Sequence, residues 1–223
     1  MPYYYFCLVL IFFYLFLIIN VLIQKIRECK FSVQTITYCL ILAILYKYNF
    51  CIDFWGLEYE DAYSFSFCAR QFSYDIYPTS FLIDAISIGS LETPLSTFTY
   101  GGHFITYPVF LSIFTNVLGW SPSLLSIINT LVAFFILLIL SVWSKEKGHK
   151  FILPAIYCFA PIINVFTTCF LSETFSSLLC ISFLFAYLKN ERFKFEYHLL
   201  SFLSLFLAIL CKRENLALLL VPI

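Results

Sequence analysis

The sequence has few charged residues. Of its 223 residues, 12% are charged, 62% are apolar and 21% are aromatic, whereas a soluble globular domain is about 25% charged and about 45–50% apolar. So few charged residues cannot cover the surface of a soluble protein. The 28 Phe and 16 Tyr residues are also too many to be buried in a single hydrophobic core. The composition therefore excludes a soluble enzyme, a disordered tail and a nucleic-acid binder, and it predicts a polytopic membrane protein.

Closely spaced cysteine pairs are also absent. The nine cysteines form no C-x-x-C motif, and most of them lie in apolar runs, where cysteine behaves as a small hydrophobic residue. We therefore expect neither a disulfide framework nor a metal cluster. Cys51 and Cys68 both lie near one loop, and we expect them to stay unpaired.

Long apolar runs, in contrast, are abundant. A membrane-crossing helix needs about 20 mostly apolar residues, and an eighth apolar run begins at Asn215 and stops at Ile223. The runs predict an all-α transmembrane bundle of about seven to eight spans, with one integral membrane domain over 1–223, and we expect the chain to be a fragment of a longer protein. The first seven stretches are 3–23, 33–50, 104–119, 122–143, 151–170, 171–188 and 197–211.

The basic residues indicate the orientation of the first two predicted spans in the membrane. None precedes the first stretch, so it is not a cleavable signal sequence, while Lys25, Arg27 and Lys30 follow it at once. The positive-inside rule places 24–32 in the cytoplasm and the N-terminus outside. The second span then delivers 51–103 to the exoplasmic face. That loop holds seven of the 13 acidic residues and one of the 13 basic residues, Arg70.

Two later segments, 144–150 and 189–198, are basic as well. If 104–119 and 122–143 are two full spans, both segments lie outside, against the positive-inside rule. If that pair is a single crossing, both segments lie inside. The sequence leaves these two arrangements open.

The exoplasmic loop opens with a carboxylate cluster, Glu58 to Asp61, among aromatic residues. As a helix, this part of the chain would align Tyr59, Tyr63 and Phe67 on one side. An aromatic stripe with carboxylates at one end fits a helix lying in the membrane interface. The cluster is either a solvated helix start or a functional site, because ionisable groups at membrane depth are costly and usually functional.

The loop closes with Gly101-Gly102-His103, just before the third apolar stretch. Paired glycines permit a turn or the close approach of a ligand. His103 could ligate a metal, donate to a phosphate oxygen or shuttle a proton. The alternative interpretation is a turn followed by an interfacial histidine.

The order of these elements resembles a known family. It is similar to that of polytopic glycosyltransferases of the GT-C fold, above all the protein O-mannosyltransferases and the aminoarabinose transferases acting on lipid A. The resemblance covers about 33–223, although 3–23 is an additional span and Cys211 replaces a threonine of the family pattern. The elements are, in chain order, Glu60-Asp61-Ala62-Tyr63, Ala69-Arg70, Gly101-Gly102-His103 with Tyr107-Pro108, Ala160-Pro161, Leu171-Ser172-Glu173 and Cys211-Lys212-Arg213.

The resemblance implies transfer of a sugar from a polyprenyl-phosphate donor to an acceptor hydroxyl on the exoplasmic face. Asp61, or else Glu60, matches the catalytic carboxylate that would act as general base. Tyr63 would pack or orient, and Arg70 is the first candidate for the donor phosphate. His103 matches the loop-closing histidine. A bound divalent ion is an alternative to these cations at the phosphate.

Two further charges belong to this predicted site. Glu173 lies at or inside the membrane with no obvious neighbour to pair with, which favours a functional role. Lys212 could meet phosphate, or it could simply anchor the end of a span. The partners implied are the lipid-linked donor, membrane lipid and an acceptor that is a protein, a lipid or a glycan.

Two other functions fit the same residues. The chain could be a non-catalytic membrane protein, a transporter or scaffold component, which would carry a path of intramembrane polar residues. It could also be an inactive transferase fragment, because it stops inside an apolar run.

Overall fold

The computed structural model describes residues 2–29, 33–50, 106–118, 122–146, 152–159, 172–189 and 194–220. Within these ranges the chain is helical and contains no strand, which confirms the all-α class. Helices suit so apolar a sequence, because a helix satisfies its backbone hydrogen bonds internally. The elements are α1 (Pro2–Glu28), α2 (Val33–Phe50), α5 (Thr106–Leu118), α6 (Pro122–Glu146), α7 (Ile152–Phe159), α9 (Glu173–Leu188), α10 (Phe195–Cys211) and the 3-10 helix η4 (Arg213–Leu220).

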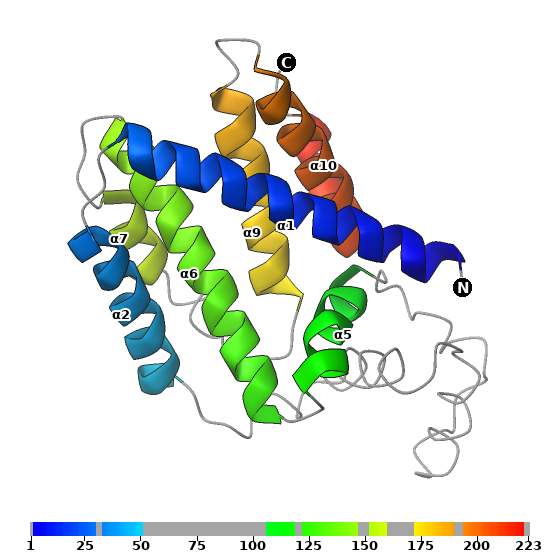
Figure 1. Ribbon diagram of the computed structural model, residues 1–223, viewed down its shortest axis with the longest axis horizontal. Helices are drawn as coiled ribbons and strands as arrows, with labels where there is room; N and C mark the ends of the chain where they lie inside the picture. The colour runs from blue at the N-terminus through cyan, green and yellow to red at the C-terminus, as the bar shows by residue number, and fades with distance from the viewer. Residues whose placement is uncertain are drawn as a thin grey trace.

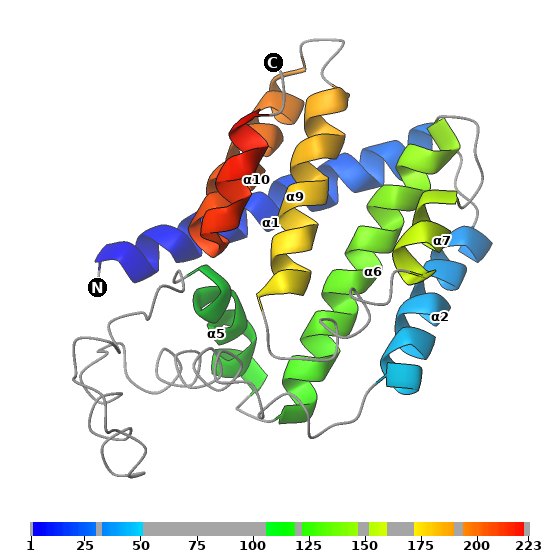
Figure 2. The ribbon, with the colours of Figure 1, turned by 180° about the vertical axis from the view of Figure 1, so that it is seen from behind.

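Three helices form the centre of the structure. α9 packs between α6 and α10, and α1 lies across this group, in front of it in Figure 1 and behind it in Figure 2. α2 and α7 pack against α6, while α5 contacts α1, α6 and α10. Helices α6 and α9 run in the same direction and α10 returns antiparallel to them.

Two helices are long and apolar enough to cross a membrane by length and composition, over Tyr5–Glu28 and Ile127–Lys145. The shorter apolar helices among the described residues are Thr35–Ile44, Thr106–Leu118, Glu173–Leu188 and Phe195–Cys211. Two candidates support a membrane location, and the full set of seven to eight spans stays a prediction.

The helix lengths bear on the two arrangements that the sequence left open. α5 has 13 residues and rises about 20 Å, less than the hydrocarbon core of about 30 Å. α6 has 25 residues and rises about 37 Å. Of the two stretches, α6 alone has the length to cross, which favours a single crossing for the pair.

Helix α1 is apolar on both sides. One face is buried against the bundle through Cys7, Ile11, Tyr14, Ile18 and Val21. This spacing of three to four residues is that of one helical face. Large side chains also cover the outward face, which exposes Phe6, Val9, Phe12, Phe13, Phe16, Ile19 and Ile23. A helix with two apolar faces fits a lipid environment better than water.

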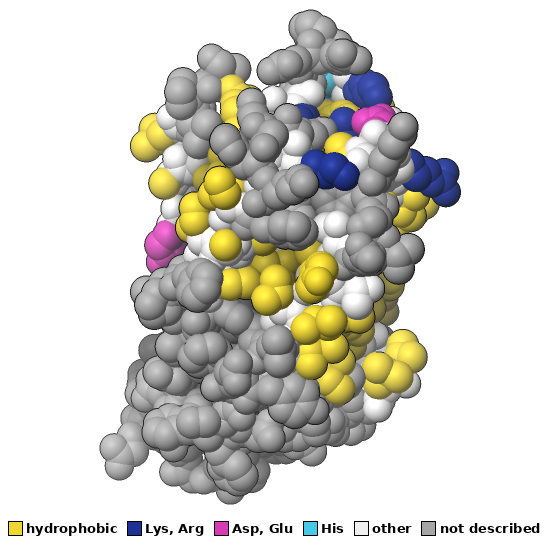
Figure 3. Space-filling view, turned by 90° about the vertical axis from the view of Figure 1, so that its left-hand side faces the viewer, with side chains coloured by type: hydrophobic (Ala, Val, Ile, Leu, Met, Phe, Trp, Pro, Cys, Tyr) yellow, Lys and Arg dark blue, Asp and Glu magenta, His cyan; other side chains and the backbone are white. Residues whose placement is uncertain are grey.

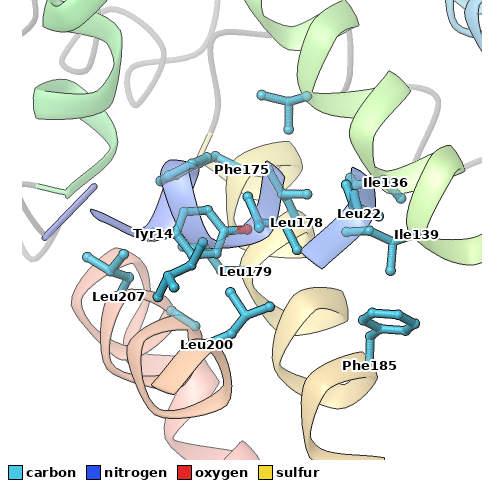
Figure 4. Packing of buried hydrophobic residues seen from close by; sticks show 14 of the residues in the cluster. Tyr14, Leu22, Ile136, Ile139, Phe175, Leu178, Leu179, Phe185, Leu200 and Leu207 are labelled. Atoms are coloured by element: carbon cyan, nitrogen blue, oxygen red, sulfur yellow. The ribbon is translucent and has the colours of Figure 1, made fainter. Parts of the chain in front are cut away.

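Polar side chains join the helices inside the core. Tyr14 of α1 and Ser182 of α9 are hydrogen-bonded at 2.8 Å. Figure 4 shows Tyr14 among the buried hydrophobic side chains around it. The Ser182 hydroxyl also donates to the Leu178 carbonyl at 2.7 Å. Because a serine hydroxyl has a single proton, Tyr14 donates and Ser182 accepts.

Similar links hold α6 to its neighbours. The Tyr107 hydroxyl on α5 donates to Asn129 Oδ1 at 3.3 Å, and Cys39 Sγ on α2 lies 3.3 Å from Ser141 Oγ. Interhelical hydrogen bonds of this kind contribute about 0.6 kcal/mol each on average in membrane proteins. They therefore fix which helix faces meet rather than supplying most of the stability.

The direction of the Tyr14–Ser182 bond predicts unequal effects of its two deletions. Tyr14→Phe leaves Ser182 bonded to Leu178 and should destabilise the fold by about 0.6 kcal/mol. Ser182→Ala strands a buried tyrosine hydroxyl and should cost about 1–3 kcal/mol. Unfolding of the purified protein in mixed micelles measures both, with Tyr38→Phe, at an exposed tyrosine, as the matched control. Equal losses for the two variants would contradict the assigned direction.

Candidate functional site

Glu173 and Lys212 form an ion pair between α9 and α10. Glu173 is the first residue of α9, and Lys212 directly follows the last residue of α10. Their side chains are 24% and 28% exposed, so both are largely withdrawn from solvent. The sequence-based expectation that Glu173 has no pairing neighbour is therefore wrong. The two residues are 39 positions apart, and only the antiparallel return of α10 brings them together.

The helix ends favour this pairing. An acidic residue in the first turn of α9 is stabilised by the positive end of the helix dipole, and a lysine just beyond α10 by the negative end. Glu173 binds Lys212 through Oε1, while its Oε2 is buried without a hydrogen-bond partner. The neighbouring Ser172 is 1% exposed, and its hydroxyl has no partner either.

Asn215 connects η4 to both helices beside the ion pair. Its amide nitrogen donates to Ser176 Oγ at 2.8 Å and to the Ala208 carbonyl at 2.7 Å. Cys180 Sγ lies 3.5 Å from its amide oxygen. Lys212, just before η4, contacts Glu173, and Asn215 of η4 contacts Ser176, each 39 positions away. The chain from Lys212 to Asn215 therefore runs beside the start of α9 in the same direction.

Helix α5 closes the other side of this corner. Thr106 Oγ1 donates to the Leu210 carbonyl at 2.8 Å, one of the last α10 carbonyls that lack an intrahelical partner. Phe110 stacks on Phe175 with ring centroids 4.1 Å apart, and Tyr107 lies 6.3 Å from the same ring. The chain that follows the acidic loop in sequence is thus fixed next to Lys212.

The other predicted site residues lie outside the described residues. These are Asp61, Glu60, Tyr63, Arg70 and His103. The structure therefore brings together two of the seven, Glu173 and Lys212. The roles expected of these five residues stay predictions.

The sequence predicted that the cysteines are small hydrophobic residues and that they form no metal cluster. Three of the described cysteines, Cys7, Cys39 and Cys211, are buried. Within the described ranges, no group of three or more His, Cys, Asp or Glu side chains could hold a metal ion. Cys51 and Cys68 lie outside these ranges.

The corner combines a lysine ammonium, a carboxylate and a hydroxyl. A lysine ammonium carries three N–H donors, of which Glu173 takes one. The hydroxyl of Ser172 and the free oxygen of Glu173 add a donor and an acceptor close by.

Comparison with family models, curated proteins and solved structures yields no match for this chain.

Three residues of the corner were missed by the sequence interpretation: Thr106, Ser176 and Asn215. Each is a polar residue within or at the edge of an apolar stretch, which is a weak signal for hydrogen bonding. Thr106 bonds Leu210, 104 positions away, and Asn215 bonds Ser176, 39 positions away, so no local pattern identifies these two contacts. The one local sign is the spacing of Lys212 and Asn215, which matches that of Glu173 and Ser176.

A double-mutant cycle on Glu173 and Lys212 should show strong coupling. Each single change, Glu173→Gln or Lys212→Gln, leaves a mostly buried charge without its partner, and the double change removes both. We expect a coupling energy of about 1–3 kcal/mol in unfolding measurements.

The control is the pair Lys25 and Glu28 within the last turn of α1, which are 2.7 Å apart with side chains 14% and 42% exposed. The same substitutions there should couple by about 0.3–0.5 kcal/mol. Equal coupling energies for the two pairs would show that the Glu173–Lys212 ion pair is no stronger than an ion pair within one helix.

Asn215→Asp should release η4 from the bundle. The change removes both donated hydrogen bonds and sets a carboxylate against the Ala208 carbonyl. Losing bonds worth about 1–3 kcal/mol should accelerate amide hydrogen exchange over 213–220 by about tenfold or more. Glu214→Gln, at the exposed neighbouring position, serves as control and should leave the exchange rates unchanged. Unchanged exchange in Asn215→Asp would show that its side chain does not hold η4.

Proposed function

We propose that the protein is a membrane glycosyltransferase that moves a sugar from a polyprenyl-phosphate donor to an acceptor hydroxyl at the exoplasmic face. The observation that carries the proposal is the meeting of Lys212, Glu173 and the start of α5 at one corner. Lys212 and Glu173 are two of the residues that the GT-C resemblance selects. Thr106 lies three residues after His103 in sequence. It is hydrogen-bonded to Leu210, which lies two residues before Lys212.

The reaction requires one proton transfer and one departing anion. The acceptor oxygen attacks the anomeric carbon while Asp61, or else Glu60, takes the hydroxyl proton. The bond between the anomeric carbon and the phosphate oxygen breaks, and its electron pair leaves with the polyprenyl phosphate. General-base assistance of this kind contributes about 10²–10⁴-fold. Arg70 and His103 would contribute positive charge at the phosphate.

Lys212 would bind the donor phosphate in this scheme. Two of its N–H donors remain for phosphate oxygens while Glu173 holds the third. Glu173 then acts as a positioning residue, because the ion pair fixes the ammonium at the end of α10. A lysine held in place before the donor arrives loses less side-chain freedom on binding.

The test is a transfer assay with the full chain reconstituted in lipid. The donors are polyprenyl-phosphate-mannose, offered with a peptide that contains serine and threonine hydroxyls, and polyprenyl-phosphate-aminoarabinose, offered with lipid A. Each donor is labelled in the sugar, and the readout is label recovered in the separated acceptor. Asp61→Asn with Glu60→Gln should lower the rate by about 10²–10⁴-fold. Lys212→Gln should raise KM for the donor, whereas Lys212→Arg, which keeps the charge, should retain most binding.

Asp84→Asn is the matched control, because it removes a carboxylate from the same loop outside the proposed cluster. It should leave the rate unchanged. Transfer that survives the loss of both Asp61 and Glu60 carboxylates would contradict the proposal. In that case the Glu173–Lys212 pair would remain a structural feature of a non-catalytic membrane protein.

A further inference from the structure

The three basic segments of the sequence meet at one end of the described structure. Lys25 and Arg27 lie in the last turn of α1, and Lys145 lies in the last turn of α6. Lys189 follows α9 and Lys194 precedes α10. Figure 3 shows Lys and Arg side chains gathered in the upper part of the molecule, above a stretch of hydrophobic side chains. We call these five residues the basic end.

Contacts between helices confirm that these residues come together. Lys25 lies over the Tyr197 ring, 5.8 Å from its centroid, which places the end of α1 at the start of α10. Trp143 on α6 contacts Phe185 on α9, with ring centroids 6.4 Å apart. Because α9 and α10 are neighbours in sequence, all four helix ends belong to one surface.

The described residues at the basic end carry a net positive charge. Five basic residues, Lys25, Arg27, Lys145, Lys189 and Lys194, stand against three acidic residues, Glu28, Glu146 and Glu196. Glu28 bonds Lys25 at 2.7 Å and lies 4.0 Å from Lys194, and Glu196 is exposed on the first turn of α10. The net charge of the basic end is therefore positive, and hydrophobic side chains lie next to it on the surface.

We propose that the basic end binds the headgroups of anionic phospholipids in the leaflet that it faces. A lipid surface fits better than a soluble partner, because the charges sit at the ends of apolar helices rather than around a cleft. Positively charged residues close to an anionic membrane are attracted by its surface potential. The proposal depends on the membrane location of the chain and not on its transfer activity.

The chain supplies its own probe for this contact. Trp143 lies two residues before Lys145, so its fluorescence reports lipids next to the basic end. The experiment uses the full chain with Trp55→Phe and Trp120→Phe, reconstituted in vesicles of phosphatidylglycerol and phosphatidylcholine. Only one lipid at a time carries brominated acyl chains, which quench tryptophan on contact. The ratio of the two quenching curves gives the preference for the anionic lipid.

The parent chain should prefer phosphatidylglycerol by about fivefold or more at low salt, and about 0.5 M NaCl should reduce that preference. The triple change K145Q, K189Q and K194Q should bring it below about twofold. The matched control K145R, K189R and K194R keeps every charge and should keep the preference.

Two outcomes would overturn the proposal: an unchanged preference in the glutamine variant, or a parent preference that does not respond to salt. The salt titration decides the question even if the glutamine variant fails to fold. An inactive transferase with an intact lipid preference would refute the proposed function alone. Activity without any lipid preference would refute only the basic end as a lipid-binding surface.

Discussion

Scarcity of charge is the constraint on which the structure depends. With 12% charged residues and helices that are apolar on both faces, a charge buried without a partner would be expensive. The described charges accordingly occur at helix ends, where water, an opposite charge or a helix dipole can meet them. Lys25, Lys145 and Lys189 mark one end of the bundle, and Glu173 with Lys212 marks the other. Between these ends the helices meet through apolar packing and a few hydrogen bonds.

The polar corner and the basic end have different chemical characters. At the corner, Lys212 is neutralised by Glu173, and Asn215 and Thr106 use their hydrogen bonds to join η4 and α5 to α9 and α10. Such an arrangement fixes a cation at a defined point, as recognition of a single phosphate would require. The basic end instead spreads positive charge over the ends of four helices, which suits a surface of many headgroups. Each end thus has the charge pattern expected for a different partner.

The sequence predicted the helical class, since long apolar runs leave little alternative. It also selected Glu173 and Lys212 as site residues, but it missed their pairing. The two residues are 39 positions apart and meet because α10 runs antiparallel to α9. The contacts of Thr106 with Leu210 and of Asn215 with Ser176 span 104 and 39 positions, so local sequence does not identify them. The length of α5 was not evident either, because its 13 residues lie inside a longer mostly apolar stretch. Asp61, Glu60, Arg70 and His103 stay sequence-based predictions.

We propose that the two ends of the bundle face opposite sides of a membrane, with 51–103 on the exoplasmic side. The most direct measurement inserts an epitope tag into the full chain, either within 51–103 or between Leu188 and Phe195, and stains cells with an antibody that cannot cross membranes. The account predicts staining of the first tag on intact cells and of the second tag only after permeabilisation. Staining of both tags on intact cells, or of neither until permeabilisation, would place the two ends on the same side and contradict the account.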